Sequence, residues 1–287
     1  MGNHRLHTGE CTQREAFGTV TMQISERNPL GDEYLREGYV IRNVADEAAH
    51  EWIVTKTAAV ATELLNLPAP KGVAASADVL NRIHEHVPVA KLNDFRMGVI
   101  HRLNSFTELR TAYFAVARPY LEEIVGNELA MQQRVNLSIQ LPGDSSSLLA
   151  VHADTWSGDS PYEVVAWLPL VDCFATKSMY LLPPKHAAEF DASFSERAGR
   201  SSETLFEAIR DQVKWLEIRS GQVLVFDQSL PHGNRVNQEA DTRWSMNCRF
   251  KGVFTPYGDK KLGEFFEPIS LRPASRRGMS YGLPRAR

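Results

Sequence analysis

The chain has 287 residues and a formal net charge of −3, and 43% of its residues are hydrophobic, 23% charged and 9% aromatic. This composition excludes a disordered, collagen-like or disulfide-rich chain, and the charge argues against a general nucleic-acid-binding protein. The sequence has no apolar signal segment and no run of about eighteen apolar residues, so we expect a cytoplasmic protein without membrane contact. The three cysteines are widely spaced and form no CxxC motif, which fits a reducing compartment.

Helical patterns dominate roughly the first 130 residues. Residues 1–30 are polar and are expected to be a flexible N-terminal segment, and a short apolar strand is expected at 37–44. Apolar residues at helical spacing, bounded by prolines and polar caps, predict the helices that follow. We expect helices at 46–65, at 76–86 with Ser76 as N-cap, and at 106–129, where Pro119 should kink or split the helix.

Short alternating segments separated by turns follow residue 131 and predict an antiparallel β structure. We expect strands within 134–141, 146–154, 162–171, 177–184, 213–227 and 242–254, and an insertion at 187–211. No linker marks the change of pattern, so we expect a single domain at 31–265, in which the N-terminal helices pack on a β core. Residues 266–287 are basic and are expected to be a solvated tail.

The sequence His152-Ala153-Asp154 is the only His-x-Asp in the chain. On an extended segment the first and third residues point to the same face, so an imidazole and a carboxylate would converge. His232 follows directly after a predicted strand. Two histidines and one carboxylate form the facial triad that holds non-heme Fe(II) and leaves other positions open. A His-x-Asp taken alone is more often an ordinary polar pair, so its significance depends on the residues around it.

Arg243 lies in a predicted strand that also carries Trp244, Met246, Cys248 and Phe250, and Ser245 follows on the face of Arg243. An arginine is seldom buried without an anionic partner. Its planar guanidinium suits a carboxylate, such as the distal one of 2-oxoglutarate. A structural ion pair with an Asp or Glu is the alternative, and the sequence favours neither.

The order strand, His-x-Asp, strands, Gly turn, His and Arg-x-Ser resembles the Fe(II)/2-oxoglutarate-dependent oxygenases. The resemblance runs from about residue 35 to 260. Within it, residues 134–173 are similar to oxygenases of bacterial carbohydrate and sugar-antibiotic biosynthesis clusters. The segments that look like the phytanoyl-CoA dioxygenase-like branch are EGYVIRNV, HAD, WLPLVDCFATKSMYLLPPKH, SGQVLVFDQSLPHGN and TRWSMNCRF.

This resemblance implies a mainly β fold with helices, built on a double-stranded β-helix (jelly-roll) core. It implies His152, Asp154 and His232 as iron ligands, and Arg243 with Ser245 as the site for the C5 carboxylate of 2-oxoglutarate. The implied cofactors are Fe(II), 2-oxoglutarate as co-substrate and dioxygen.

Polar residues next to these motifs are further candidates. Asn136, Ser138 and Gln140 share one strand face, where they would hydrogen-bond 2-oxoglutarate or substrate inside the barrel, unless that face is solvated. The loop after the His-x-Asp offers aromatic, hydroxyl and carboxyl groups that suit a sugar, although the same residues fit a plain turn. The loop candidates for substrate binding are Trp156, Ser157, Asp159 and Tyr162.

Asn247 and Arg249 continue the face of Arg243 and are candidates for substrate binding. Arg249 would contact a phosphate or carboxylate of the substrate, and it is also a second candidate for the carboxylate anchor. Lys177 is another basic candidate, but we expect it to be a solvated lysine in a turn.

The expected function is oxidation of a C–H bond of a sugar or sugar-containing natural product, by hydroxylation as the default and by cyclisation or epimerisation as other outcomes. The expected partner is a small molecule, a sugar or a glycosylated or phosphorylated metabolite, and neither nucleic acid nor membrane. Two other classes stay open: a metalloenzyme with the same triad, such as an isomerase or hydrolase, and a non-catalytic jelly-roll binding module. A homodimer is also open.

Overall fold

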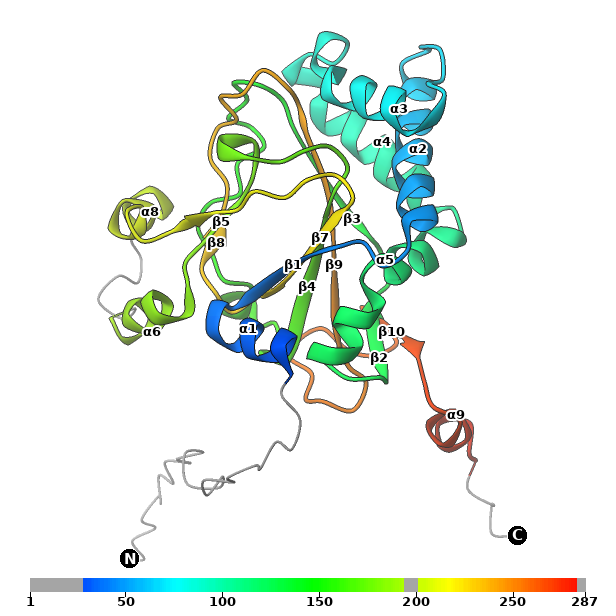
Figure 1. Ribbon diagram of the computed structural model, residues 1–287, viewed down its shortest axis with the longest axis vertical. Helices are drawn as coiled ribbons and strands as arrows, with labels where there is room; N and C mark the ends of the chain where they lie inside the picture. The colour runs from blue at the N-terminus through cyan, green and yellow to red at the C-terminus, as the bar shows by residue number, and fades with distance from the viewer. Residues whose placement is uncertain (1–27, 194–200, 283–287) are drawn as a thin grey trace, which may run out of the picture.

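The computed structural model describes residues 28–193 and 201–282, which form two antiparallel β-sheets and eight α-helices (Figure 1). Most of the N-terminal segment expected to be flexible lies outside the described residues. Its last residues belong to helix α1 (Pro29–Glu37), which Asn28 caps by accepting a hydrogen bond from the Gly31 amide. Within the described ranges, every helix is too short or too polar to cross a lipid bilayer.

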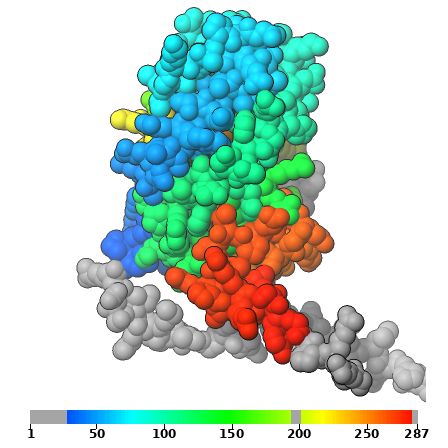
Figure 2. All heavy atoms as spheres, turned by 90° about the vertical axis from the view of Figure 1, so that its right-hand side faces the viewer, coloured from blue at the N-terminus to red at the C-terminus, as the bar shows by residue number. Residues whose placement is uncertain are grey.

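Four helices form a layer on one side of the sheets (Figure 1). They are α2 (Glu47–Leu64), α3 (Gly72–Asn81), α4 (Leu92–Asn104) and α5 (Glu108–Ile124). Side chains anchor this layer to the sheet: the buried Tyr113 hydroxyl donates to the Ala166 carbonyl at 2.9 Å, and the Trp244 indole donates to the Leu80 carbonyl at 2.8 Å. Figure 2 shows these helices as one continuous face above the C-terminal segment.

The helices differ from the sequence prediction in three respects. Ser76 is not an N-cap, because α3 begins at Gly72 and the buried Ser76 hydroxyl donates to the Gly72 carbonyl within the helix. Helix α4 was not predicted, although its buried residues Leu92, Phe95, Val99 and Leu103 recur at helical spacing. Helix α5 is not split at Pro119. It ends at Ile124, before the predicted end at 129, where a strand already begins at Leu129.

The larger sheet has the strand order β1-β7-β4-β9-β2-β10, and β3 also pairs with β9. The smaller sheet has the order β6-β5-β8. All strand pairings are antiparallel. The strands of the larger sheet are β1 (Tyr39–Asn43), β2 (Leu129–Gln132), β3 (Asn136–Gln140), β4 (Glu163–Pro169), β7 (Gln222–Asp227), β9 (Arg243–Gly252) and β10 (Phe266–Ser270). Those of the smaller sheet are β5 (Tyr180–Leu181), β6 (Lys214–Trp215) and β8 (His232–Gly233).

Strand β9 separates the hydrophobic core from the space between the sheets. Alternation along the strand directs Trp244, Met246, Cys248 and Phe250 into the core. The alternate residues, from Arg243 to Arg249, face the other way and line a cavity. The two faces of this one strand therefore serve packing and a polar site.

Other segments differ from the expected strands and boundaries. Residues 146–154 form no strand in the described chain and contribute only an isolated bridge, His152 with His232. The segment expected to be an insertion begins inside α6 (Pro184–Ala192) and contains α8 (Ser202–Ile209), with residues 194–200 outside the described part. The tail predicted from residue 266 begins with β10, which pairs with β2, and continues as α9 (Pro273–Met279).

Candidate metal centre

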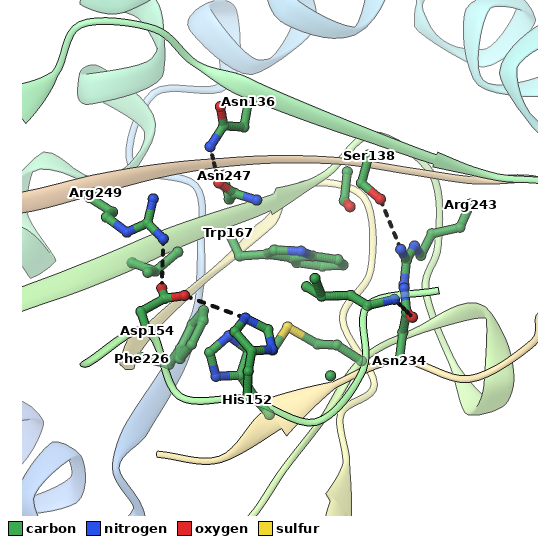
Figure 3. A pocket seen from close by; sticks show the side chains of 16 residues that line it. Asn136, Ser138, His152, Asp154, Trp167, Phe226, Asn234, Arg243, Asn247 and Arg249 are labelled. Carbon is green, nitrogen blue, oxygen red and sulfur yellow. Dashed lines mark hydrogen bonds and ion pairs between the residues drawn. The ribbon is translucent and has the colours of Figure 1, made fainter. Parts of the chain in front are cut away.

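Two histidines from distant segments are held side by side by their own backbones. The His152 amide donates to the His232 carbonyl at 3.0 Å, and the His232 amide donates to the His152 carbonyl at 2.8 Å. The Asp154 amide donates to the Gln228 carbonyl at 3.0 Å, which places the Asp154 carboxylate beside the rings (Figure 3). One ligand atom from each of the three side chains lies within 4.8 Å of the others. The predicted triad is therefore brought together.

Both imidazoles are oriented for metal binding. Nδ1 of His152 lies 2.8 Å from the Ala150 carbonyl oxygen, and Nδ1 of His232 lies 2.8 Å from the Leu230 carbonyl oxygen. A carbonyl only accepts hydrogen bonds, so Nδ1 carries the proton in each neutral ring and Nε2 keeps its lone pair. This fixed tautomer is the one that metal-binding histidines use.

The charge states of the triad also fit a metal. Burial lowers the pKa of His232 to about 4, so this ring is neutral at physiological pH. Burial alone would raise the pKa of Asp154, but the hydrogen bond with His152 and the charge of Arg249 hold it well below its usual value. Burial works against protonation of His152, but its hydrogen bonds to Asp154 and Ala150 leave its pKa raised. The site therefore offers a carboxylate and a neutral imidazole without prior proton loss.

The triad opens into a cavity of about 330 Å³ that lies between the two sheets. Of the predicted cofactor and substrate residues, Asn136, Ser245, Asn247, Arg243 and Arg249 line it, as does Ser138. Sequence reasoning missed several residues of the wall. These are Leu149, Val165, Trp167, Met179, Phe226, Gly233 and Asn234.

Strand alternation carried a signal for some of the missed residues. Trp167 and Val165 share a face of β4, and register pairs Trp167 with Asn247 on β9. No sequence pattern indicated Asn234. Its side-chain oxygen accepts a hydrogen bond from the Leu149 backbone amide at 2.6 Å, and its backbone amide donates to the Leu149 carbonyl at 3.0 Å. These bonds attach the loop before His152 to the segment after β8.

Arg243 has a buried guanidinium without an acidic partner. The residue is 3% exposed and donates to the Ser178 carbonyl at 3.1 Å and to the Ser138 hydroxyl at 2.9 Å. No Asp or Glu of the described residues forms an ion pair with it. Arg243 Nε and Ser245 Oγ, both buried, have no hydrogen-bond partner in the described part of the chain. Burial lowers the pKa of Arg243 to about 10, so it stays positively charged at neutral pH.

Arg249, by contrast, already has anionic partners. Its Nη2 lies 2.9 Å from Asp154 Oδ2 and 3.5 Å from Asp159 Oδ2. Its Nε donates to Gln228 Oε1 at 3.0 Å. Asp159 is paired in turn with Lys260, whose Nζ lies 2.6 Å from Asp159 Oδ1. Arg249 therefore lines the cavity as predicted, but its guanidinium already contacts Asp154, Asp159 and Gln228. The sequence did not predict these contacts.

Several other candidates lie away from this cavity. Gln140 is fully buried, and its Nε2 donates to the Arg235 carbonyl at 2.6 Å. Lys177 is not solvated: it is 1% exposed, and its Nζ donates to Asn81 Oδ1 at 2.7 Å. Neither residue is among the described residues that line the cavity.

The loop after Asp154 is also displaced from the cavity. The Trp156 ring stacks on Phe190 of α6, with centroids 5.9 Å apart. Asp159 is 5% exposed and ion-paired, and Tyr162 is 53% exposed. None of the four loop candidates, Trp156, Ser157, Asp159 and Tyr162, is among the described residues of the cavity wall. Gly158 ends the short 3-10 turn at Asp154–Ser157 with a positive φ of +87°, a conformation that favours glycine.

Comparison with solved structures supports the fold. One similar structure is the non-heme monooxygenase ThoJ in a nickel complex, with a TM-score of 0.52, 16% identity, and coverage of 85% of this chain and 84% of that one. Another is the non-heme alpha ketoglutarate dependent carbocyclase SnoK from nogalamycin biosynthesis, with a TM-score of 0.51, 17% identity, and coverage of 85% and 97%. No protein-family model and no curated protein matches the chain. The comparisons do not single out the phytanoyl-CoA dioxygenase-like branch, which stays a prediction.

Proposed function

We propose that the chain is a non-heme Fe(II)/2-oxoglutarate-dependent dioxygenase that oxidises a C–H bond of a sugar or sugar-containing natural product. Hydroxylation is the default outcome, with cyclisation or epimerisation as variants. The observation that carries the proposal is the buried, acid-free guanidinium of Arg243 in the same cavity as the His152, Asp154 and His232 triad. Of the two similar structures, one is named a non-heme monooxygenase and the other a non-heme alpha ketoglutarate dependent carbocyclase, and both names fit this proposal.

The empty donor positions around Arg243 match a carboxylate. A buried positive charge without a counter-ion is costly, and an incoming carboxylate would offset that cost. Arg243 Nε and Ser245 Oγ have no partner in the described residues, and both belong to the cavity wall. We therefore assign Arg243 and Ser245 to the C5 carboxylate of 2-oxoglutarate, with Ser138 orienting the guanidinium.

The three triad side chains would hold the iron, and the chain supplies position and environment. When bound, the iron supplies the oxidative decarboxylation of 2-oxoglutarate by dioxygen that allows a C–H bond to be attacked. The carbonyls of Ala150 and Leu230 hold the two rings through Nδ1. Trp167 and Phe226 cover the cavity wall with apolar surface, which excludes water from the reacting centre (Figure 3).

The amide pair Asn136 and Asn247 is the proposed site for substrate hydroxyl groups. Asn136 Nδ2 donates to Asn247 Oδ1 at 3.0 Å, which fixes both amides across β3 and β9. The Asn136 oxygen and the Asn247 amide hydrogens stay available as acceptor and donors, a combination that matches a sugar hydroxyl. We thus propose Asn136 for substrate binding, although the sequence analysis counted it first among the groups that bind 2-oxoglutarate.

The same proposal covers the architecture. The two antiparallel sheets enclose the cavity, and the metal ligands lie at its edge, as a double-stranded β-helix would place them. A jelly-roll core with N-terminal helices is therefore the architecture we propose.

An anaerobic spectrum tests the function. Purified protein is reconstituted with Fe(II), 2-oxoglutarate is added, and the visible absorption is recorded. We expect a weak metal-to-ligand charge-transfer band that is lost in His152→Ala and in Arg243→Ala. The matched control is Arg235→Ala, which removes an exposed pair with Glu203 and should keep the band.

The outcomes separate the alternatives. Bound iron without a band, and no effect of Arg243→Ala, would favour a metalloenzyme of another class. A protein that binds no metal would favour the non-catalytic binding module.

A further inference from the structure

The two oxygens of the Asp154 carboxylate have different surroundings (Figure 3). Oδ1 lies 3.4 Å from His152 Nε2 and faces the metal-binding atoms. Oδ2 lies 2.9 Å from Arg249 Nη2 and faces away from them. The side chains of Asp154 and Arg249 are only 10% and 16% exposed, so water competes weakly for this pair.

Arg249 is itself fixed from two other directions. Its Nε donates to Gln228 Oε1, and Gln228 Nε2 donates to Glu163 Oε2 at 3.1 Å. The Gln228 carbonyl accepts the Asp154 amide, so one residue holds both members of the pair. The Asp159 carboxylate, anchored by Lys260, lies on the remaining side of the guanidinium.

We infer that Arg249 is a positioning residue that restricts Asp154 to binding the metal through Oδ1 alone. This inference rests on the proposed role of Asp154 as a ligand. Three protein donors leave three open positions on an octahedral ion, which 2-oxoglutarate and dioxygen need together. A carboxylate bound through both oxygens would occupy one of these positions. Arg249 keeps that position open by holding Oδ2.

The contacts of Arg249 weigh against a role in binding a substrate anion. Its guanidinium lies beside two carboxylates, of Asp154 and Asp159, which already balance its charge. A substrate phosphate or carboxylate would have to share this single positive charge with Asp154 and Asp159 and would bring a third negative charge beside them. That repulsion between like charges in a partly buried site disfavours an anion there.

The test compares Arg249→Met with wild type, using Co(II) alone as the first probe. The Co(II) d–d spectrum reports coordination geometry without 2-oxoglutarate or turnover. We expect a changed spectrum, because a released Asp154 can bind through both oxygens. For the Co(II)-loaded variant we expect 2-oxoglutarate to bind at least about tenfold more weakly, as loss of one coordination position implies. The matched control is Arg42→Met, which breaks a comparable pair with Glu33 away from the cavity.

Unchanged Co(II) spectra and 2-oxoglutarate affinity within twofold of wild type would overturn the inference. Loss of Co(II) binding by a folded Arg249→Met protein would also overturn it, since a released Asp154 should bind the metal through both oxygens and keep it in place. If Arg249→Met does not fold, Arg249→Lys keeps the charge but cannot reach Gln228, Asp154 and Asp159 together, and a changed Co(II) spectrum is again expected. Should wild type bind Co(II) but no 2-oxoglutarate, the proposed function fails while the spectral comparison still decides the role of Arg249.

Discussion

Arg243 carries a positive charge where burial makes charge expensive. The described chain gives it two neutral hydrogen-bond acceptors, the Ser178 carbonyl and the Ser138 hydroxyl, and no carboxylate. A residue kept in this state lowers stability in the absence of its ligand and raises it when the ligand binds. Arg243 is therefore a place where stability and binding conflict.

Replacing this arginine should relieve the cost. We expect metal-free Arg243→Met to be at least as stable as wild type, with a gain of up to about 1 kcal/mol. With Mn(II) present throughout, increasing 2-oxoglutarate should raise the thermal midpoint of wild type and leave that of the variant unchanged. A loss of more than about 1 kcal/mol in the metal-free variant would show that the two hydrogen bonds outweigh the charge.

At the residue scale, the sequence predicted groups whose spacing is short or whose placement on a strand is fixed. Arg243 and Ser245 lie two positions apart on one face of β9, as period-two geometry predicts. His152 and Asp154 are also two positions apart and do converge, although their segment forms only an isolated bridge. Gln228 follows directly after β7, and Asp159 and Lys260 lie in loops, so no local pattern links these neighbours of Arg249 to β9. These contacts were consequently not predicted, and a role of Arg249 in substrate binding stays a prediction.

At the element scale, helix α4 sets the position of strand β3. The Asn104 side chain at the end of α4 donates to the Val135 carbonyl at 3.0 Å and accepts from the Val135 amide at 2.9 Å. These two bonds satisfy the backbone just before Asn136, the first residue of β3. The helix that sequence analysis missed thus helps to fix one wall of the cavity.

Removing this side chain should loosen the wall. We expect Asn104→Ala to lower the free energy of unfolding by about 1–3 kcal/mol, because it leaves two backbone groups unpaired. The control is Asn93→Ala on the same helix, whose side chain accepts only an exposed bond from Arg96 and should change stability by less than about 0.5 kcal/mol. Chemical denaturation of both variants measures the difference, and equal midpoints would exclude this role for Asn104.

Elements were predicted well where pattern and context agree. Residues 46–65 read as a helix and fold as α2, and the alternation at 242–254 becomes β9. The segment 146–154 was also expected to be a strand, but its neighbour β8 has only two residues, so only the bridge at His152 forms. The difference is tertiary, because strands need a partner and helices do not.

At the scale of the whole molecule, the C-terminal segment divides into a part that belongs to the fold and a part that does not. Phe266 of β10 is fully buried and packs with Ala130 and Val253 in a second, small core. Helix α9 has no buried residue in the described chain. The basic residues that predicted a solvated tail fit α9, which is exposed, but gave no indication of β10, which pairs with the sheet.

Two truncations test this division. Removal of residues 273–287 should leave the thermal midpoint close to that of the full chain. Removal of 266–287 should lower it clearly, because it deletes Phe266 and exposes the edge of β2. Equal midpoints for the two truncations would show that β10 contributes nothing to the fold.

The short backbone bridge between His152 and His232 has a consequence for how this protein can diversify. It joins the two ends of the segment 152–232, which contains β4 and β7 of the larger sheet as well as α6, α8 and most of the smaller sheet. Within this segment β5 pairs with β6, so the ends of the stretch that carries α6 and α8 are held together. That stretch can lengthen or shorten at little entropic cost, because loop closure depends only weakly on loop length. Insertions and deletions can therefore accumulate there while the bridge keeps His152 beside His232.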